Sequence, residues 1–125
     1  MKLLRVSTAV SALLFSTTLF AADSAPLRSV NGVLVNSAGM TVYTYDKDTP
    51  DSGKSSCVAT CAKNWPPVMA EGTPAAPYSV VTREDGGKQL AHKGKPLYTF
   101  VKDKKAGDKT GDGVGGAWHV VAGTE

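Results

Sequence analysis

The sequence predicts a small all-β domain, an antiparallel sheet sandwich or barrel of about six short strands built from two duplicated halves. Three observations predict it. Short segments rich in Val, Tyr and Thr alternate with Gly, Pro, Asn and Asp from residue 30 onward, and this alternation favours strands joined by turns. The phrase TVYTYDKD at 41–48 returns as PLYTFVKD at 96–103. The chain of 125 residues is also of single-domain length.

The beginning of the chain has the layout of a secretory signal peptide. Lys2 and Arg5 precede an apolar stretch that runs from about residue 6 to residue 20, and the small residues Ala21 and Ala22 follow. Serines and threonines interrupt this stretch, so it is too short and too polar for a permanent span, which needs ~20 apolar residues. We therefore expect cleavage near residue 21 and no transmembrane anchor afterwards.

Cleavage leaves a chain of nearly balanced charge. It removes two basic residues and no acid, so that 14 basic against 11 acidic residues become 12 against 11. Because nucleic-acid-binding proteins carry a clear basic excess, we expect no nucleic-acid partner. The expected organisation is a signal peptide at 1–21, a flexible segment at 22–29 and a single domain at 30–125 with repeats at about 30–70 and 78–122.

The first half is predicted to be a hairpin followed by a short helical segment. The strands VNGVLVN (30–36) and MTVYTYD (40–46) flank a turn at 37–39. The segment near 56–64 has serines suited to an N-cap and then an alanine-rich composition. Pro66 and Pro67 end it, because they lack the amide hydrogens that a helix requires.

The second half is predicted to repeat this plan. YSVVTRE (78–84) and KQLAHK (88–93) flank a turn that contains two glycines, and KPLYTFVKD (95–103) follows a tight turn at Gly94. A loop rich in Gly, Asp and Lys leads to a closing strand, AWHVVAG (117–123). With about 100 mature residues, the chain can bury one small core.

The doubled phrase predicts how that core is filled. Alignment of the two halves at an offset of 55 residues places each aromatic residue and the final aspartate of one phrase on its counterpart in the other. Strand side chains alternate between faces, so the two aromatic rings of each phrase point to one side, into a shared core. Each aspartate falls where a strand ends, and we expect it to cap the next turn. This structural motif comprises Tyr43, Tyr45, Asp48, Tyr98, Phe100, Asp103, and the approximately corresponding Trp65 and Trp118.

The same residues resemble a known bacterial family. The pattern Tyr-x-aromatic-x-x-Asp, at YTYDKD and YTFVKD, resembles the family described as a secreted repeat of unknown function, whose members are often predicted lipoproteins. SSCVATCAKNWPP is similar to its cysteine and Trp-Pro-Pro stretch, and GDGVGGAWHVV to its closing segment. The resemblance covers roughly 30–122 and implies an exported, duplicated module. No cysteine lies near the expected cleavage point, so the sequence offers no attachment site for a lipid anchor.

The two cysteines allow two interpretations. An even number of cysteines in an exported chain predicts a disulfide, here between Cys57 and Cys61. The alternative is a copper(I) or redox site, since thiolate, thioether and imidazole groups are the ligands that soft metals prefer. The residues available to such a site are Cys57, Cys61, Met69 and His92, with Met40 and His119 as further candidates.

The remaining motifs favour no reaction. Carboxylates on glycine-rich loops could hold calcium, but neither aspartate-rich loop has EF-hand spacing. No nucleophile-elbow pattern is present. We therefore expect a non-enzymatic, monomeric, periplasmic or secreted module without a cofactor, which binds an unknown ligand or an envelope protein. The alternatives are an extracytoplasmic copper or electron-transfer accessory protein that uses Cys57 and Cys61, and third, an enzyme of unknown reaction.

Overall fold

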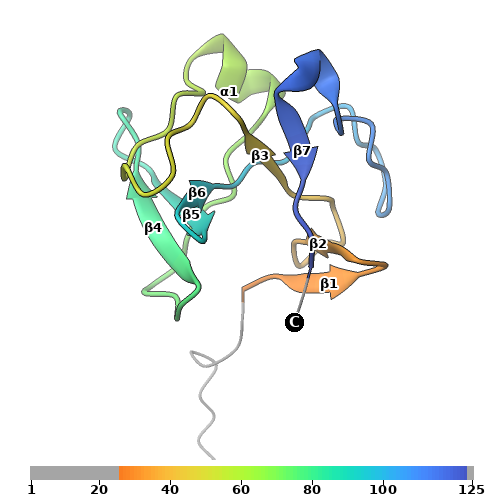
Figure 1. Cartoon of the computed structure of the whole chain (residues 1–125), viewed down its shortest axis with the longest axis horizontal. Helices are drawn as coiled ribbons and strands as arrows, with labels where there is room; N and C mark the ends of the chain where they lie inside the picture. Colours follow the sequence, from red (N-terminus) through yellow and green to blue (C-terminus); the bar gives the residue numbers. More distant parts are fainter. Residues whose placement is uncertain (1–25, 124–125) are drawn as a thin grey trace, which may run out of the picture.

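A computed structural model describes residues 26–123 (Figure 1). Short strands form three small antiparallel sheets, and one short α-helix accompanies them in the described residues. The prediction of an all-β fold with a short helical segment is confirmed. Within 26–123 the strands do not close into a barrel. The expected signal peptide at 1–21 and residues 22–25 lie outside the described residues.

The elements follow one another in a simple order. The strands are β1 (Arg28–Val30), β2 (Val33–Val35), β3 (Tyr43–Tyr45), β4 (Tyr78–Thr82), β5 (Lys88–His92), β6 (Lys95–Pro96) and β7 (Trp118–Val120), and the helices are α1 (Thr60–Asn64) and the 3-10 turn η2 (Val114–Gly116). Strand β1 pairs with β2, β3 pairs with β7, and β4, β5 and β6 form the third sheet. The helical segment expected at 56–64 is thus confined to its last turn.

The first hairpin differs from the prediction. The segment 30–36 is not one strand, because Asn31 and Gly32 both have positive φ, 52° and 85°, and turn the chain between β1 and β2. Asn-Gly is the dipeptide that suits this turn, since both residues tolerate left-handed backbone. Lys93 and Gly94 also both have positive φ, 54° and 82°, and turn the chain between β5 and β6.

The two halves of the chain meet at a pair of equivalent residues. The backbone N–H of Tyr43 donates to the carbonyl of Tyr98 over 2.7 Å, and the N–H of Tyr98 donates to the carbonyl of Tyr43 over 2.9 Å. On their other sides, Tyr43 lies opposite Val120 and Tyr98 lies opposite Pro67. A two-fold axis produces this kind of reciprocal contact between equivalent positions. We refer to the axis that passes between Tyr43 and Tyr98 and relates the two halves as the pseudo-two-fold axis.

The closing segment of each half lies beside the hairpin of the other half. The N–H of Leu34 donates to the carbonyl of Val121 over 2.9 Å, and the N–H of Leu90 donates to the carbonyl of Val68 over 2.7 Å. Leu34 and Val68 belong to the first half, whereas Leu90 and Val121 belong to the second. Each half therefore completes the other half's sheet. Figure 1 shows β7, near the end of the chain, crossing beside β3 and reaching down to β2.

Aromatic rings fill the core along the pseudo-two-fold axis. Four rings stack in the order Tyr45, Trp118, Trp65 and Phe100, with centroid separations of 4.1, 3.7 and 3.9 Å. The two Trp rings are parallel to within 1° and sit at the centre of this stack. Tyr43 and Tyr98 meet it edge-on, at 5.5 Å from Trp65 and 5.2 Å from Trp118 respectively.

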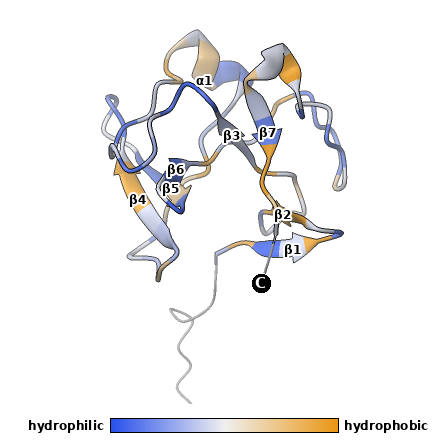
Figure 2. Cartoon of the chain, viewed as in Figure 1, coloured by the Kyte–Doolittle hydropathy of each residue, from blue (hydrophilic) through white to orange (hydrophobic). Residues whose placement is uncertain are grey.

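An aliphatic cluster completes the interior. It buries one side of the hairpins and consists of Leu27, Leu34, Val42, Leu90 and Leu97. Figure 2 shows hydrophobic stretches in short lengths scattered over several strands, with hydrophilic stretches between them. A core assembled from many short segments needs both halves of the chain to be present, since neither half contributes enough apolar area alone.

Candidate functional site

The tyrosine hydroxyls bind aspartates across the pseudo-two-fold axis. Tyr43 Oη donates to Asp103 Oδ2 over 2.6 Å, and Tyr98 Oη donates to Asp48 Oδ2 over 2.6 Å. Both tyrosines are fully buried, and both aspartates are nearly so. Each tyrosine therefore bonds to the aspartate of the other repeat, and the aspartate of its own repeat bonds elsewhere.

The second oxygen of each aspartate holds a loop. Asp48 Oδ1 accepts the N–H of Ser56 over 2.6 Å, and Asp103 Oδ1 accepts the N–H of Thr110 over 2.8 Å. These donors lie 8 and 7 residues further along the chain. The aspartates thus fasten distant parts of their loops, in place of the cap on the immediately following turn that the sequence suggested.

The buried phenols remain donors at neutral pH. Burial, and then the hydrogen bond to Asp103, raises the pKa of Tyr43 well above its usual value. Burial, and then the hydrogen bond to Asp48, raises the pKa of Tyr98 in the same direction. Both hydroxyls therefore stay protonated near pH 7 and donate hydrogen bonds from one repeat to the other.

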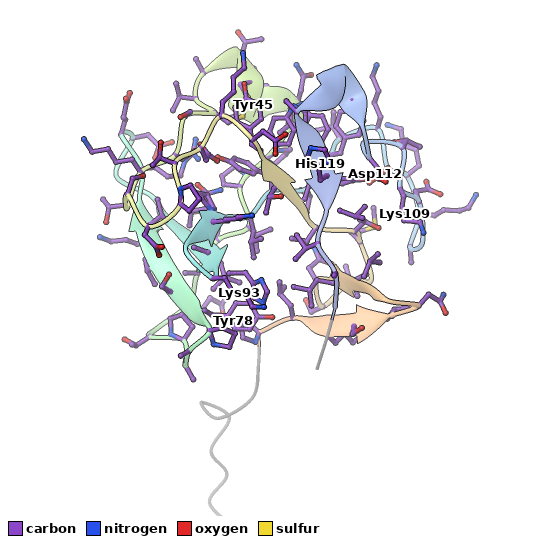
Figure 3. All side chains as sticks on the ribbon, viewed as in Figure 1. Tyr45, Tyr78, Lys93, Lys109, Asp112 and His119 are labelled. Carbon is purple, nitrogen blue, oxygen red and sulfur yellow. A yellow bond between two sulfur atoms is a disulfide. The ribbon has the colours of Figure 1, made fainter. Side chains whose placement is uncertain are left out.

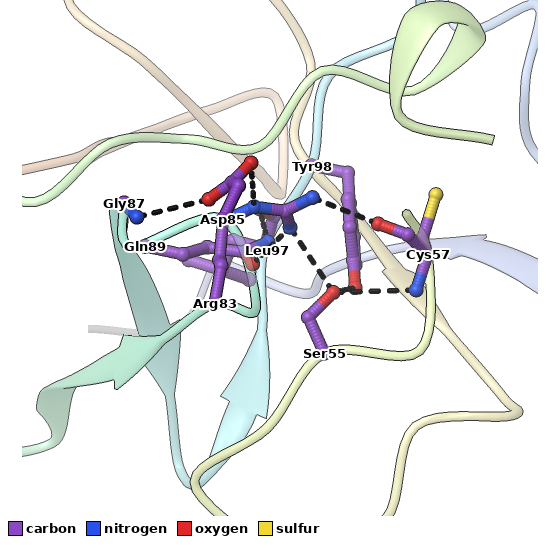
Figure 4. A network of polar contacts seen from close by, with 8 residues as sticks. All are labelled: Ser55, Cys57, Arg83, Asp85, Gly87, Gln89, Leu97 and Tyr98. Atoms are coloured by element: carbon purple, nitrogen blue, oxygen red, sulfur yellow. Dashed lines mark hydrogen bonds and ion pairs between the residues drawn. The ribbon is translucent and has the colours of Figure 1, made fainter. Parts of the chain in front are cut away.

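A buried arginine organises the first repeat's loop (Figure 4). Arg83, only 4 % exposed, donates from Nη1 to Gln89 Oε1 over 2.8 Å and to Ser55 Oγ over 3.1 Å. Its Nη2 donates to the carbonyl of Cys57 over 2.9 Å, and its Nε lies 3.5 Å from Asp85 Oδ2. Ser55 is also within hydrogen-bond distance of the Tyr98 hydroxyl. The network therefore joins β4, β5 and the loop before α1.

Sequence reasoning missed the role of Arg83. It stands in the run Thr-Arg-Glu-Asp at the end of a strand, next to two acids, which is the setting of an ordinary surface residue. Only the pairing of β4 with β5 turns its side chain inward, towards Gln89. No local signal in the sequence marks that orientation.

The structure places a disulfide between Cys57 and Cys61. The Sγ–Sγ distance is 1.97 Å and the Cα atoms are 5.1 Å apart. Cys57 is fully buried in the aromatic core cluster. Sulfurs bonded to each other are not thiolates, and in this form they cannot act as the two soft ligands of the copper alternative.

The other candidate metal ligands are dispersed. Met69 and His92 line two different grooves, and His119 Nε2 lies 2.8 Å from Asp46 Oδ2 on the surface. Among residues 26–123, no three or more His, Cys, Asp or Glu side chains gather in a way that could hold a metal ion. The structure therefore does not bring the predicted metal-ligand set together.

The loop aspartates that suggested calcium bind backbone amides. Asp108 Oδ2 accepts the N–H groups of Lys104 and Lys105, over 2.8 and 3.1 Å, and these hydrogen bonds lower the pKa of Asp108. Asp112 Oδ1 accepts the N–H of Val120 over 3.1 Å. These contacts are those of aspartates that stabilise turns.

Two grooves lie at pseudo-two-fold-related positions. Groove 1 has a volume of about 620 Å³. It is lined by residues that are mostly apolar or uncharged: Pro26, Leu27, Asn36, Ser37, Pro67, Val68, Met69, Ala70, Glu71, Gly72, Thr73, Pro74, Leu90 and Thr99. Met69 is 52 % exposed at its surface. Groove 1 is therefore an accessible depression with both apolar and polar surface.

Groove 2 has a volume of about 250 Å³ and a different character. It is lined by Thr44, His92, Lys93, Lys95, Val120, Val121 and Ala122. The hairpin turn and the closing segment of the second repeat supply all of these residues except Thr44, which comes from β3 in the first repeat. No residue of the Tyr–Asp pairs and no member of the Arg83 network lines either groove.

The comparisons agree with the duplication. The model of a family described as "Secreted repeat of unknown function" matches the chain twice, over residues 28–69 and 79–122. No curated protein and no solved structure matches the chain. Over the described part of the chain, none of the helices is both long enough and apolar enough to cross a membrane.

Proposed function

The chain belongs to the family of secreted repeats of unknown function, and from that premise we propose that it is a non-enzymatic binding module of the periplasm or envelope. Groove 1 is the ligand site. The single observation that carries the proposal is its size and lining, because about 620 Å³ lies within the ~300–1,000 Å³ of small-molecule sites. Such sites are mostly apolar and contain a few polar groups that orient the ligand.

The lining specifies the class of ligand. Leu27, Val68 and Met69 offer apolar surface, and Asn36 and Thr99 offer uncharged hydrogen-bonding groups. Glu71 is the one charged residue among the lining residues. A small, uncharged molecule with both apolar and hydrogen-bonding groups suits this surface, because it requires no desolvated charge to be compensated.

The buried polar groups support binding over catalysis. Tyr43, Tyr98 and Arg83 carry the chain's most unusual polar contacts, and each is directed at another protein group in the interior. None of them lines a groove, so these three groups do not face the proposed ligand. The copper alternative lacks comparable support, since Cys57 and Cys61 are bonded to each other.

Fluorescence with the neutral apolar probe N-phenylnaphthylamine tests the proposal on the mature protein. We expect saturable binding that the substitution Met69→Lys weakens on the order of tenfold, because it places a charge in the apolar lining. The matched control is Val101→Lys, at another exposed apolar side chain that does not line the groove. Equal binding by wild type and Met69→Lys, or equal losses in both variants, would refute groove 1 as the site.

A further inference from the structure

Groove 2 is the counterpart of groove 1 but carries different side chains. The pseudo-two-fold axis relates Thr44 to Thr99 and Val121 to Val68, and members of both pairs line the grooves. The residues that the hairpin turns contribute differ most between the two grooves. Where groove 1 has Asn36 and Ser37, groove 2 has two consecutive basic residues, His92 and Lys93, followed by Lys95. The duplicated position therefore offers two chemically distinct surfaces.

The charge of groove 2 is not balanced by its own lining. His92, Lys93 and Lys95 line it together, and no acid does. Asp51 approaches the turn between the lysines, and its N–H donates to the carbonyl of Gly94 over 2.8 Å. Among the described residues, however, no carboxylate forms an ion pair with either lysine. Two ammonium groups thus remain available to an anion in the groove.

The surroundings of His92 disfavour its charged form. Burial, and then the charges of Lys93 and Lys95, lowers the pKa of the imidazole below its usual value. The ring of Tyr78 lies beside it, with a centroid separation of 5.1 Å. Figure 3 shows Lys93 and Tyr78 close together below β5 and β6, on the side that faces β1. The positive charge of the groove therefore resides on Lys93 and Lys95.

The floor of groove 2 is apolar. Val120, Val121 and Ala122 come from the closing segment, and Thr44 adds one hydroxyl from β3. A short hydrocarbon chain gains free energy by covering such a floor, at roughly 0.8 kcal/mol for each buried CH₂ group. A negative group at the other end of the same molecule would reach the cationic rim.

We infer that groove 2 is a second binding site, which takes a small amphiphilic anion with one carboxylate and a short apolar chain. The carboxylate lies between Lys93 and Lys95, and the chain lies along Val120 to Ala122. This assignment does not depend on the proposed role of groove 1. It rests on the basic rim, on the apolar floor and on the volume of about 250 Å³.

An NMR titration of the ¹⁵N-labelled mature protein with hexanoate tests the inference, with hexanol and hexylammonium as matched neutral and cationic compounds. Hexanoate should give saturable shifts at the amides of Lys93 and Val120 to Ala122. Hexanol should bind on the order of tenfold more weakly, and hexylammonium more weakly still. High salt should weaken the binding of hexanoate but not that of hexanol.

Two lysine pairs provide matched variants. Lys93→Asn with Lys95→Gln removes the cationic rim, and Asn tolerates the positive φ of 54° at position 93. This pair should weaken hexanoate about tenfold or more. The control, Lys102→Gln with Lys104→Gln, makes the same change in net charge at exposed positions outside both grooves and should leave binding unchanged.

Three outcomes would overturn the inference. One is equal binding of hexanol and hexanoate, which would remove the role of the lysines. Another is unchanged hexanoate affinity in the rim variant with a native spectrum. The third is a set of shifts at residues 67–70, which would assign the anion to groove 1. If the rim variant fails to fold, the comparison of compounds and the salt dependence of the wild-type protein decide the question.

Discussion

At the scale of single residues, Tyr43 and Tyr98 contribute in two ways. Their rings pack edge-on against the aromatic stack, and their hydroxyls donate to Asp103 and Asp48. A buried carboxyl group needs partners, because leaving one unsatisfied costs roughly 1–3 kcal/mol or more. The apolar and polar roles of each tyrosine can be separated by removal of the hydroxyl alone.

The substitution Tyr43→Phe should lower the free energy of unfolding by about 1–3 kcal/mol, because Asp103 loses a buried donor. The N–H of Gly111, which donates to Tyr43 Oη over 3.1 Å, also loses its acceptor. Urea denaturation followed by tryptophan fluorescence measures the change. Tyr45→Phe is the control. Its ring belongs to the same core, and no hydrogen bond of its hydroxyl occurs among the described residues. If both variants lose the same small amount, the hydrogen bond to Asp103 does not contribute.

The sequence predicted the buried rings but not the exchange of partners. Alternation along a strand is enough to place Tyr43 with Tyr45, and Tyr98 with Phe100, on one face. The spacing of tyrosine and aspartate, however, is the same in both repeats. Each hydroxyl could therefore bond within its own repeat or across to the other, and only the packing of the two repeats selects the second arrangement.

At the scale of elements, the two repeats differ most in the segment before each tryptophan. The first repeat has α1 and the Cys57–Cys61 disulfide before Trp65. The second has η2 before Trp118 and contains no cysteine. A five-residue helix is too short to persist by itself. The disulfide and the hydrogen bond from Arg83 to the Cys57 carbonyl therefore hold α1 in place.

Reduction of the disulfide should lower the free energy of unfolding by at most ~2 kcal/mol, the entropy expected for so small a ring. The chain should remain folded, because the aromatic stack does not include either sulfur. Urea titrations with and without a phosphine reductant measure the difference. A Cys57→Ala, Cys61→Ala variant should show no response to reductant. Complete unfolding on reduction would contradict the prediction and make the disulfide essential.

Element boundaries were predictable only where the sequence signal is local. Gly94 and the two prolines after Trp65 marked a turn and the end of a helix correctly. The turn at Asn31 and Gly32 was equally local but was interpreted as the interior of a strand. Residues 56–59 did not join the helix. Ala59 has a positive φ of 56°, and the segment before it is held by hydrogen bonds from Arg83 and to Asp48.

At the scale of the whole molecule, the repeats behave as the two partners of an intertwined pair. Each supplies the other with an aspartate, a closing strand and half of the ring stack. Such interdependence predicts that neither half has a stable fold of its own. It also predicts that covalent continuity between the halves is dispensable, because the contacts form across the axis.

Fragments 26–72 and 73–123 should be unfolded separately and should assemble when mixed. The near-ultraviolet circular dichroism of the stacked tryptophans reports the assembly, because each fragment supplies one ring. A 73–123 fragment with Gly111→Ala is the control that should fail, since a Cβ there would lie 2.8 Å from the Trp65 ring. Cooperative unfolding by either fragment alone would contradict the interdependence.

The crossing of the closing segments also affects the order in which the chain can fold as it is made. The neighbour of Leu34 is Val121, and the partner of Tyr43 lies 60 residues further on. Contacts so distant in sequence slow folding, because long loops must close before any contact is gained. During synthesis the first hairpin cannot make its contacts with the closing segment until almost the last residue has been added. Until then the polypeptide stays accessible to chaperones, proteases and any machinery that handles extended chains.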